Sequence, residues 1–569
     1  MCDYFDDTGY VCPQENLEDN DYCIFHLRDD NKDVDEFNKR IKQLLETEED
    51  LINFHGFYFP PETSDFSRQI FQKKINFYYV IFSGVANFSG ATFSKAYFNF
   101  ATFSREAYFS GAIFSETIFS NAIFSGDAIF SNVTFSGEAY FSGAKFLGES
   151  VFSSVSFSRV ADFSTVSFSR VADFSNAIFS GESDFGIVAF SEADFSNVTF
   201  SGEAYFDNAT FSREAYFSGA IFSEKTDFNR ATFSGEADFI GATFSREAYF
   251  SGAIFSEKTD FDRATFSGEA DFIGATFSEK ANFIGATFSG EADFEYVEFE
   301  GKFVFIPNKS GTIDFENTYF SDNVRIKADM SKCYFANSNI ERVDMTDSSW
   351  IRDDDKPKNS VLAFIKKVKN KVGLSDTSIV ICEEQQGKLS SNWKKLEGIY
   401  RRLKQSYQKY GDTSTAGKFY YQEMECKRKQ LKGVEKHFWY LFYKKLCGYG
   451  EIPFNVIWAS LFLIFVSAFL YLFGGIEFVG SSVLKVPPNV IDYNLSLNSF
   501  GIQWARSNID LIYEDFKLCL YTSVITFTTL GYGDVHPIGF SRIVASVEAG
   551  FGIIMTALFI FVFTRKMLR

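Results

Sequence analysis

The chain has 569 residues, too many for a single hydrophobic core, so several domains are expected. Phenylalanine alone supplies 74 residues, far above ordinary usage, and the formal net charge is −19. That charge argues against nucleic acid as a partner bound through its phosphates, and the acidic, polar start MCDYFDDTGY argues against a signal peptide.

The N-terminal segment, residues 1–65, carries a set of potential metal ligands. Three thiols and one imidazole occur in the pattern C-x9-C-x10-C-x2-H, formed by Cys2, Cys12, Cys23 and His26. Such a set is a normal tetrahedral site for structural Zn²⁺. The alternative is unrelated reduced cysteines, because the outer spacings are not diagnostic. Apolar residues then recur at helical steps from Val34 to Leu45, which predicts a helix capping the next domain.

A short repeat fills residues 66–350. The string ATFSREAYFSGAIFSEKTDF occurs at 209–228 and again at 242–261, and Phe recurs in steps of five and six residues. A small residue stands two positions before nearly every Phe, and residues two apart share one face of an extended strand. Such steps give no helical stripe, so the repeat predicts a solenoid with one short strand per unit and Phe stacked inside. About forty units at four per coil would give roughly ten coils.

The repeat resembles that of the pentapeptide-repeat family, in which a small residue, a polar residue, Leu or Phe, and two turn residues form the unit. ANFSG at 86–90 and ATFSK at 91–95 fit that unit. The resemblance implies a right-handed quadrilateral β-helix. An extra sixth residue in alternate units, such as Glu106 or Glu203, departs from the family and predicts a bulged corner. We expect a stiff spacer or a docking surface for a cytoplasmic ligand or protein; imitation of DNA by an acidic flank is the alternative.

Residues 351–435 are rich in lysine and helical in period. Gly411 followed by Asp412 predicts the end of one helix and the cap of the next, so an α-helical hairpin adaptor is expected. Its two apolar faces would consist of Trp393, Leu396, Tyr400, Leu403 and Tyr407, and of Phe419, Tyr420 and Met424. Residues 436–454 mix aromatic residues with lysines, which is typical of an interfacial segment at a membrane, and the turn at 448–450 predicts a bend.

Residues 455–569 are predicted to cross a membrane twice. The stretches 455–476 and 543–563 are long and apolar enough to span a bilayer core, and Glu548 is the one charged residue within them. An acid at that depth faces either a cavity or a polar partner, which the sequence does not identify. Basic residues lie before the first span and after the second, at Lys444, Lys445, Arg565, Lys566 and Arg569. By the positive-inside rule, both termini are expected in the cytoplasm.

Between the spans, residues 516–534 end in TTLGYGD, and their apolar part is too short to cross. A re-entrant helix followed by a loop is expected, because non-helical backbone at membrane depth is tolerated where it lines a cavity. Gly531 and Gly533 permit backbone conformations that point successive carbonyl oxygens at one axis. The motif and the two spans look like those of two-transmembrane tetrameric potassium channels.

The channel resemblance implies roles for individual residues. The selectivity filter would consist of Thr529, Leu530, Gly531, Tyr532 and Gly533, supported by Thr528, Asp534 and Tyr521. Leu530 replaces the commoner Val, and Ile525 stands where some channels carry a Glu that pairs with the position of Asp534. Gly552 matches the gating hinge of the inner helix, with Gly550 as its rival; close helix packing is the alternative role for Gly552.

These features predict a multidomain membrane protein with a β-helix, an α-helical hairpin and a two-helix pore domain. The expected function is a potassium-selective channel that conducts K⁺ passively as a homotetramer in the lipid bilayer of the cell membrane. Its cytoplasmic repeats would regulate gating, assemble the protein or dock partners. No enzymatic activity is expected, because His55, His437 and His536 lie in unrelated segments. The alternative function is a membrane-anchored scaffold whose pore is vestigial or nonselective among cations.

Overall fold

The computed structural model describes residues 2–6, 9–18, 20–46, 48–350, 381–385, 392–478, 490–491 and 509–567. The chain divides into two units: residues 1–351 with 381–388, and residues 352–380 with 389–569. Residues 351–380 and 386–391 of the predicted adaptor lie outside the described residues, as do 479–489 and 492–508 of the segment between the predicted spans.

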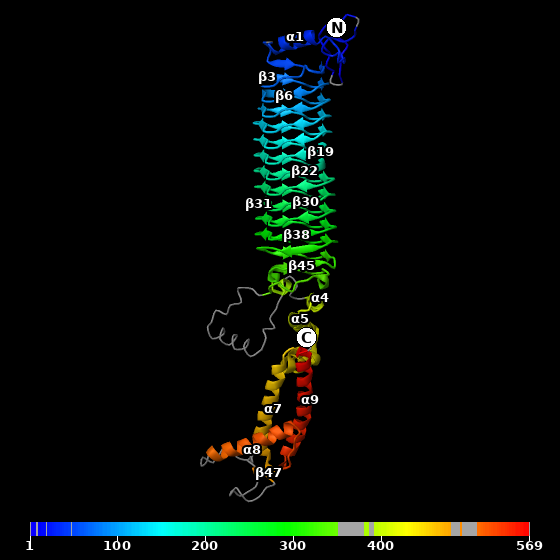
Figure 1. Cartoon of the computed structure of the whole chain (residues 1–569). Helices are drawn as coiled ribbons and strands as arrows, with labels where there is room; N and C mark the ends of the chain where they lie inside the picture. The colour runs from blue at the N-terminus through cyan, green and yellow to red at the C-terminus, as the bar shows by residue number, and fades with distance from the viewer. Residues whose placement is uncertain are drawn as a thin grey trace. The chain divides into compact units, whose positions relative to one another are not determined.

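The first unit contains a β-solenoid of about 13 turns. Figure 1 shows it as a stack of short strands coloured from blue to green. Most strands from β1 to β46 are two residues long, and four of them make one turn; one such set is β11 (Ile123–Phe124), β12 (Ala128–Ile129), β13 (Thr134–Phe135) and β14 (Ala139–Tyr140). Each strand pairs in parallel with the equivalent strand one turn on, so that Phe124 lies opposite Phe146. This pairing satisfies backbone donors and acceptors between turns. The prediction of four units per coil is confirmed.

Phenylalanine rings fill the solenoid interior in continuous columns. The rings of Phe98 and Phe119 stack with centroids 4.6 Å apart and planes 4° apart, and Phe141 continues the column at 4.9 Å. Adjacent columns meet edge to face, as Phe119 and Phe130 do at 90°. Both arrangements suit the ring quadrupole. The small residues two positions earlier, such as Ala96, are buried beside the rings, as the repeat predicts.

The corners of the solenoid are of two kinds. In many five-residue steps one corner residue has a positive φ, as at Gly111 (68°) and Asn121 (59°), which are residue types that tolerate the left-handed region. Six-residue steps lengthen the corner. In β19 (Ser167–Asp173) against β22 (Ala189–Asp194), where a six-residue step faces a five-residue step, the register shifts between Phe168 and Val171. The predicted bulge is confirmed there.

The N-terminal end of the solenoid is covered by helix α1 (Val34–Leu45), as expected. Its buried Phe37 packs edge-on against Phe59 of β2 (Tyr58–Phe59), with ring centroids 5.3 Å apart. The strand ladder starts at β1 (Leu51–Asn53), which pairs with β3 (Ile70–Asn76), and so begins before residue 66. This early start helps to explain why there are more turns than the roughly ten expected. The repeat is degenerate there, although Ile52 and Phe59 supply the same inward positions.

The other end of the solenoid is covered by the short helix α3 (Cys382–Gln385), which contacts η1 (Met330–Lys332) and β46 (Cys333–Tyr334). The buried carboxylate of Glu383 accepts the backbone N–H of Phe335 at 2.5 Å. Burial, with Glu316 and Asp314 nearby, raises the pKa of Glu383 to about 7. The side chain therefore takes a backbone donor that no further turn would satisfy.

The described part of the second unit begins with the predicted helical hairpin. Helix α4 (Trp393–Lys409) is followed by Gly411 at φ 88°, and Asp412 caps α5 (Thr413–Gln430) by accepting the backbone N–H of Thr415 at 3.0 Å. Each helix buries most of its predicted face: Leu396, Tyr400, Leu403 and Tyr407 in α4, and Phe419 and Met424 in α5. The interfacial residues then form α6 (Gly433–Phe438), the π-helical η4 (Trp439–Lys445) and η5 (Gly448–Gly450), where Tyr449 has φ 57° and the chain bends as predicted.

Three helices complete the second unit: α7 (Pro453–Gly474), α8 (Ile509–Phe527) and α9 (Ser541–Met567). Helices α7 and α9 are long and apolar enough to cross a membrane. Helix α8 begins at Ile509 rather than at 516, because the intervening residues contain no Gly or Pro that would end it. A small antiparallel sheet joins β47 (Ile476–Phe478) to β48 (Val490–Ile491) and to β49 (Val535–Pro537).

Candidate functional sites

The segment 528–534 follows directly after the C-terminal end of α8. Thr529, Gly531 and Gly533 have φ values of 58°, 47° and 76°, so the backbone alternates through the left-handed region that glycine tolerates. The N–H of Leu530 donates to the Ile525 carbonyl at 2.9 Å, which turns the chain sharply back after the helix. In a single chain, the side chains of Leu530 and Tyr532 are 58% and 68% exposed.

Two predicted supporting residues meet beside this segment. The hydroxyl of Tyr521, on α8, donates to a carboxylate oxygen of Asp534 at 2.8 Å. At the other end of the segment, the Thr528 hydroxyl and backbone N–H both donate to the Val524 carbonyl, at 2.7 and 3.0 Å. These bonds tie both ends of the segment to α8.

Gly552 of α9 is buried against the end of α8. A Cβ atom at this position would lie 2.0 Å from the carbonyl oxygen of Phe527, whereas one at Gly550 would meet nothing within 4 Å. Helix α9 is continuous through both residues. This geometry favours close packing as the role of Gly552, and a hinge at either glycine stays a prediction.

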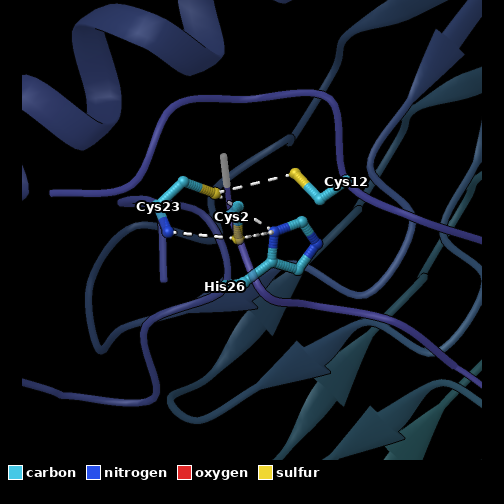
Figure 2. A group of neighbouring side chains, drawn as sticks. All are labelled: Cys2, Cys12, Cys23 and His26. Atoms are coloured by element: carbon cyan, nitrogen blue, oxygen red, sulfur yellow. Dashed lines mark hydrogen bonds between the residues drawn. The ribbon is translucent and has the colours of Figure 1, made fainter. Parts of the chain in front are cut away.

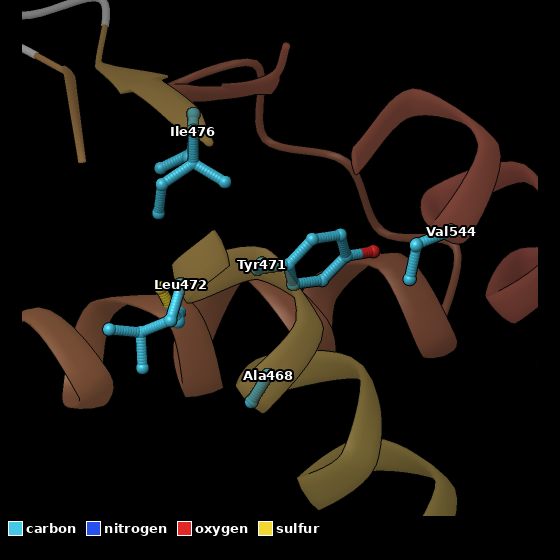
Figure 3. Packing of buried hydrophobic residues seen from close by; sticks show 7 residues of the cluster. Ala468, Tyr471, Leu472, Ile476 and Val544 are labelled. Atoms are coloured by element: carbon cyan, nitrogen blue, oxygen red, sulfur yellow. The ribbon is translucent and has the colours of Figure 1, made fainter. Parts of the chain in front are cut away.

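Glu548, one turn before Gly552, has the polar partners that the sequence did not identify. Its carboxylate accepts the hydroxyl of Tyr471 from α7 at 2.6 Å and the hydroxyl of Ser523 from α8. Tyr471 itself belongs to a buried apolar cluster, drawn in Figure 3 with its neighbours Ala468, Leu472, Ile476 and Val544. No local spacing announces these contacts, because Tyr471 lies 77 residues from Glu548.

A second polar network lies near Arg565, at the C-terminal end of α9. Glu425 of α5 accepts hydrogen bonds from Arg428 at 2.5 Å, Lys444 at 3.0 Å and the Tyr449 hydroxyl at 2.9 Å. Burial acts to raise the pKa of Glu425, but these donors outweigh it and lower the pKa to about 2. Arg565 lies 4.4 Å from the ring centroid of Tyr420 on α5. The hairpin, the bend and the last turn of α9 are thus tied together.

The four predicted metal ligands converge at the N-terminus (Figure 2). Their ligand atoms lie within 4.8 Å of one another and all four residues are buried. Nδ1 of His26 is 3.1 Å from Sγ of Cys23, and the Sγ atoms of Cys12 and Cys23 are 3.9 Å apart. Two sulfur ligands that are each about 2.3 Å from a tetrahedral Zn²⁺ lie roughly 3.8 Å from one another. The 3.9 Å separation of the Cys12 and Cys23 sulfur atoms is close to that value, so these residues could hold a tetrahedral metal ion.

A second layer of contacts orients the cluster. Nε2 of His26 is 3.0 Å from the carbonyl oxygen of His55, so Nε2 carries the proton and Nδ1 is free to bind a metal. The N–H of Cys23 donates to Sγ of Cys2 at 3.2 Å, and the Tyr4 ring stacks on His26 at 4.0 Å. This contact joins residues 29 positions apart, so no local spacing in the sequence indicated it.

Comparison with models of known families gives two matches. A model described as pentapeptide repeats (9 copies) matches residues 77–123, 119–166, 188–231, 217–264 and 250–298. A model described as ion channel matches residues 502–569, which include α8, segment 528–534 and α9. The chain contains pentapeptide repeats and an ion channel domain. Neither a search of curated proteins nor one of solved structures gave a match.

The match to an ion channel model indicates that the two long apolar helices lie in a membrane. Together with α7 and α9, the two helices among the described residues that are long and apolar enough to cross a membrane, it supports a two-span membrane protein. An ion channel transports an ion, and neither matched family is typically enzymatic.

Proposed function

We propose that this ion channel is selective for K⁺ and that four copies of the chain surround one pore. The observation that carries the proposal is TTLGYGD at the end of α8, with left-handed backbone at Thr529, Gly531 and Gly533, inside the ion channel domain. Rings of backbone carbonyl oxygens from four such segments would replace the hydration shell of K⁺. Conduction is passive, down the electrochemical gradient.

The exposure of segment 528–534 supports an assembly of several copies. Lipid cannot satisfy the N–H and C=O groups of non-helical backbone, so at membrane depth the segment must be buried in protein or line a water-filled cavity. The side chains of Leu530 and Tyr532 are exposed in a single chain, which leaves room for a protein neighbour there. Neighbouring copies of the same chain supply one by symmetry. Lys444 before α7 and Arg565 at the end of α9 favour a cytoplasmic location for both flanks, and with them the solenoid. Arg569 lies outside the described residues.

The test is K⁺ and Na⁺ flux through the purified full-length protein in liposomes. Gly531→Ala should abolish K⁺ selectivity, because φ of 47° is unfavourable for a residue with a Cβ by roughly 1–2 kcal/mol. Gly433→Ala is the matched control, since it has φ of 57° and open space but lies outside the pore domain. Unchanged K⁺ selectivity in the Gly531 variant would contradict the filter assignment. Equal Na⁺ flux in the wild type would indicate a nonselective pore, and no barium-sensitive flux would favour the scaffold.

The pentapeptide repeats are proposed to regulate gating, assemble the protein or dock a cytoplasmic partner. Their surface offers a stiff, regular support, and fold alone does not choose among these roles. Deleting residues 1–350 should leave a conducting pore with altered opening, measured by single-channel recording. Loss of tetramers after the deletion would assign the repeats to assembly instead.

We further propose that Cys2, Cys12, Cys23 and His26 hold one structural Zn²⁺ per chain. The support is the convergence of their ligand atoms and the His26–His55 hydrogen bond described above. Metal analysis of the purified chain should find one Zn²⁺, and Cys23→Ser should lose it while Cys447→Ser retains it. A wild-type chain without zinc, or a Cys23 variant with full zinc content, would contradict the assignment.

A further inference from the structure

Helix α9 meets α8 at two levels, one helical turn apart. Glu548 and Gly552 are four residues apart on α9, and Ser523 and Phe527 are four residues apart on α8, so each pair lies on one helix face. At the first level, the Ser523 hydroxyl donates to the Glu548 carboxylate. At the second level, Gly552 lies directly against the Phe527 carbonyl. Phe527 is the last residue of α8, so this double contact is immediately beside segment 528–534.

The third helix joins at the Glu548 level. The Tyr471 hydroxyl of α7 donates to one carboxylate oxygen, and Ser523 contacts the other. The Ser523 hydroxyl also lies 2.9 Å from the Ile464 carbonyl of α7. Glu548, Tyr471 and Ser523 are all at most 1% exposed. A single carboxyl group therefore connects both spans and α8.

Apolar packing by itself would leave the position of α8 loosely defined. Lipid is as apolar as the side chains, so the hydrophobic effect does not hold α8 against the two spans, and van der Waals contacts between apolar side chains have little directional preference. Hydrogen bonds from two helices to one carboxyl fix height and rotation together, because their geometry is restricted. A buried acid is costly unless its oxygens are hydrogen-bonded, and here both oxygens have a partner.

We infer that Glu548 is a positioning residue for ion conduction: it fastens α8 to both membrane spans and so sets where segment 528–534 stands. The inference rests on the proposed channel function, because it assigns a role in placing the proposed filter. A functional site needs its supporting residues placed within about 0.5 Å, which directional bonds supply and apolar contacts do not.

The test compares variants of the full-length protein in liposomes. Glu548→Leu should lower the K⁺/Na⁺ permeability ratio by about tenfold or more, while Glu548→Gln, which keeps the shape and both polar atoms, should stay within about threefold of the wild type. Ser523→Ala should fall between them. The control is Thr522→Val, whose buried hydroxyl bonds only the Leu518 carbonyl of its own helix at 2.8 Å, and it should leave the ratio unchanged.

A second measurement separates this inference from the proposed function. Amide hydrogen exchange of α8 should accelerate in Glu548→Leu and Ser523→Ala but not in Glu548→Gln or Thr522→Val. A wild-type protein without K⁺ selectivity would reject the proposed function, and exchange in α8 would still decide whether Glu548 holds that helix. Wild-type exchange and wild-type ion ratios in both the Leu and the Ser523 variants would overturn the inference. If Glu548→Leu fails to fold, the Ser523 and Gln variants decide the question alone.

Discussion

Replacing Gly552 by alanine tests the packing between α8 and α9 most directly. The added Cβ would lie 2.0 Å from the Phe527 carbonyl oxygen and 2.9 Å from its carbonyl carbon. Ordinary C···O contacts are about 3.3 Å or longer, so the two helices must separate by roughly 1 Å. Both obstructing atoms belong to the backbone of α8, so no side chain can turn aside to make room. The displacement would therefore reach the end of α8 and the segment that follows.

The expected cost follows from two opposing effects. Forcing an extra methyl group into a packed interface costs about 1–3 kcal/mol, and the better helix propensity of Ala returns up to about 1 kcal/mol. We expect Gly552→Ala to lower stability by roughly 1–2 kcal/mol and to reduce K⁺ selectivity. Gly550→Ala, two residues away on the same helix with nothing within 4 Å, should gain up to about 1 kcal/mol.

The assay is thermal unfolding of both variants in detergent, together with K⁺ and Na⁺ flux in liposomes. A Gly552 variant as stable as the Gly550 variant, with wild-type flux, would refute the close contact. A stable Gly552 variant that opens less often but stays selective would instead favour a hinge at this glycine.

Three further predictions concern the rest of the chain. Because the pKa of Glu383 is raised to about 7, ionisation of this carboxyl lowers the stability of the fold as the pH rises from about 4.5 to 7. Glu383→Gln should therefore raise the melting temperature at pH 8 but not at pH 4. Equal melting temperatures of the variant and the wild type at pH 8 would contradict the buried carboxyl. Phe217→Ala, within a stacked column, should lower the free energy of unfolding by about 3–5 kcal/mol, measured by denaturant unfolding. Tyr216→Ala on the outer face should lower it by less than about 1 kcal/mol. Equal losses in the two variants would mean that the column contributes no additional stability. Glu425→Gln should destabilise the hairpin by roughly 1–3 kcal/mol at pH 7, since Arg428 and Lys444 lose the negative charge with which they pair. The difference from wild type should shrink as the pH falls below about 4 and the wild-type carboxyl approaches its pKa of about 2, and a pH-independent difference would contradict the network.

The repeat determined the solenoid because its information is local. A Phe every five or six residues, with a small residue two positions earlier, defines the inward face of each strand, and identical units can only stack on one another. Length and apolarity likewise determined the two long helices, since a bilayer imposes a fixed span. The helical hairpin was also predictable from local signals, because Gly411 and the N-cap Asp412 lie between two segments with helical apolar periodicity.

Tertiary structure decided the contacts that join residues distant in sequence. Glu548 accepts hydrogen bonds from residues of two other helices, and Gly552 faces a backbone carbonyl of α8. The backbone carbonyl of His55 orients the ring of His26. The degenerate first turn at β1 also became visible only through its pairing with β3. Periodicity indicates which face of an element is apolar. The partner on the facing element depends on how the helices and strands pack, and the pattern within one segment contains no information about that packing.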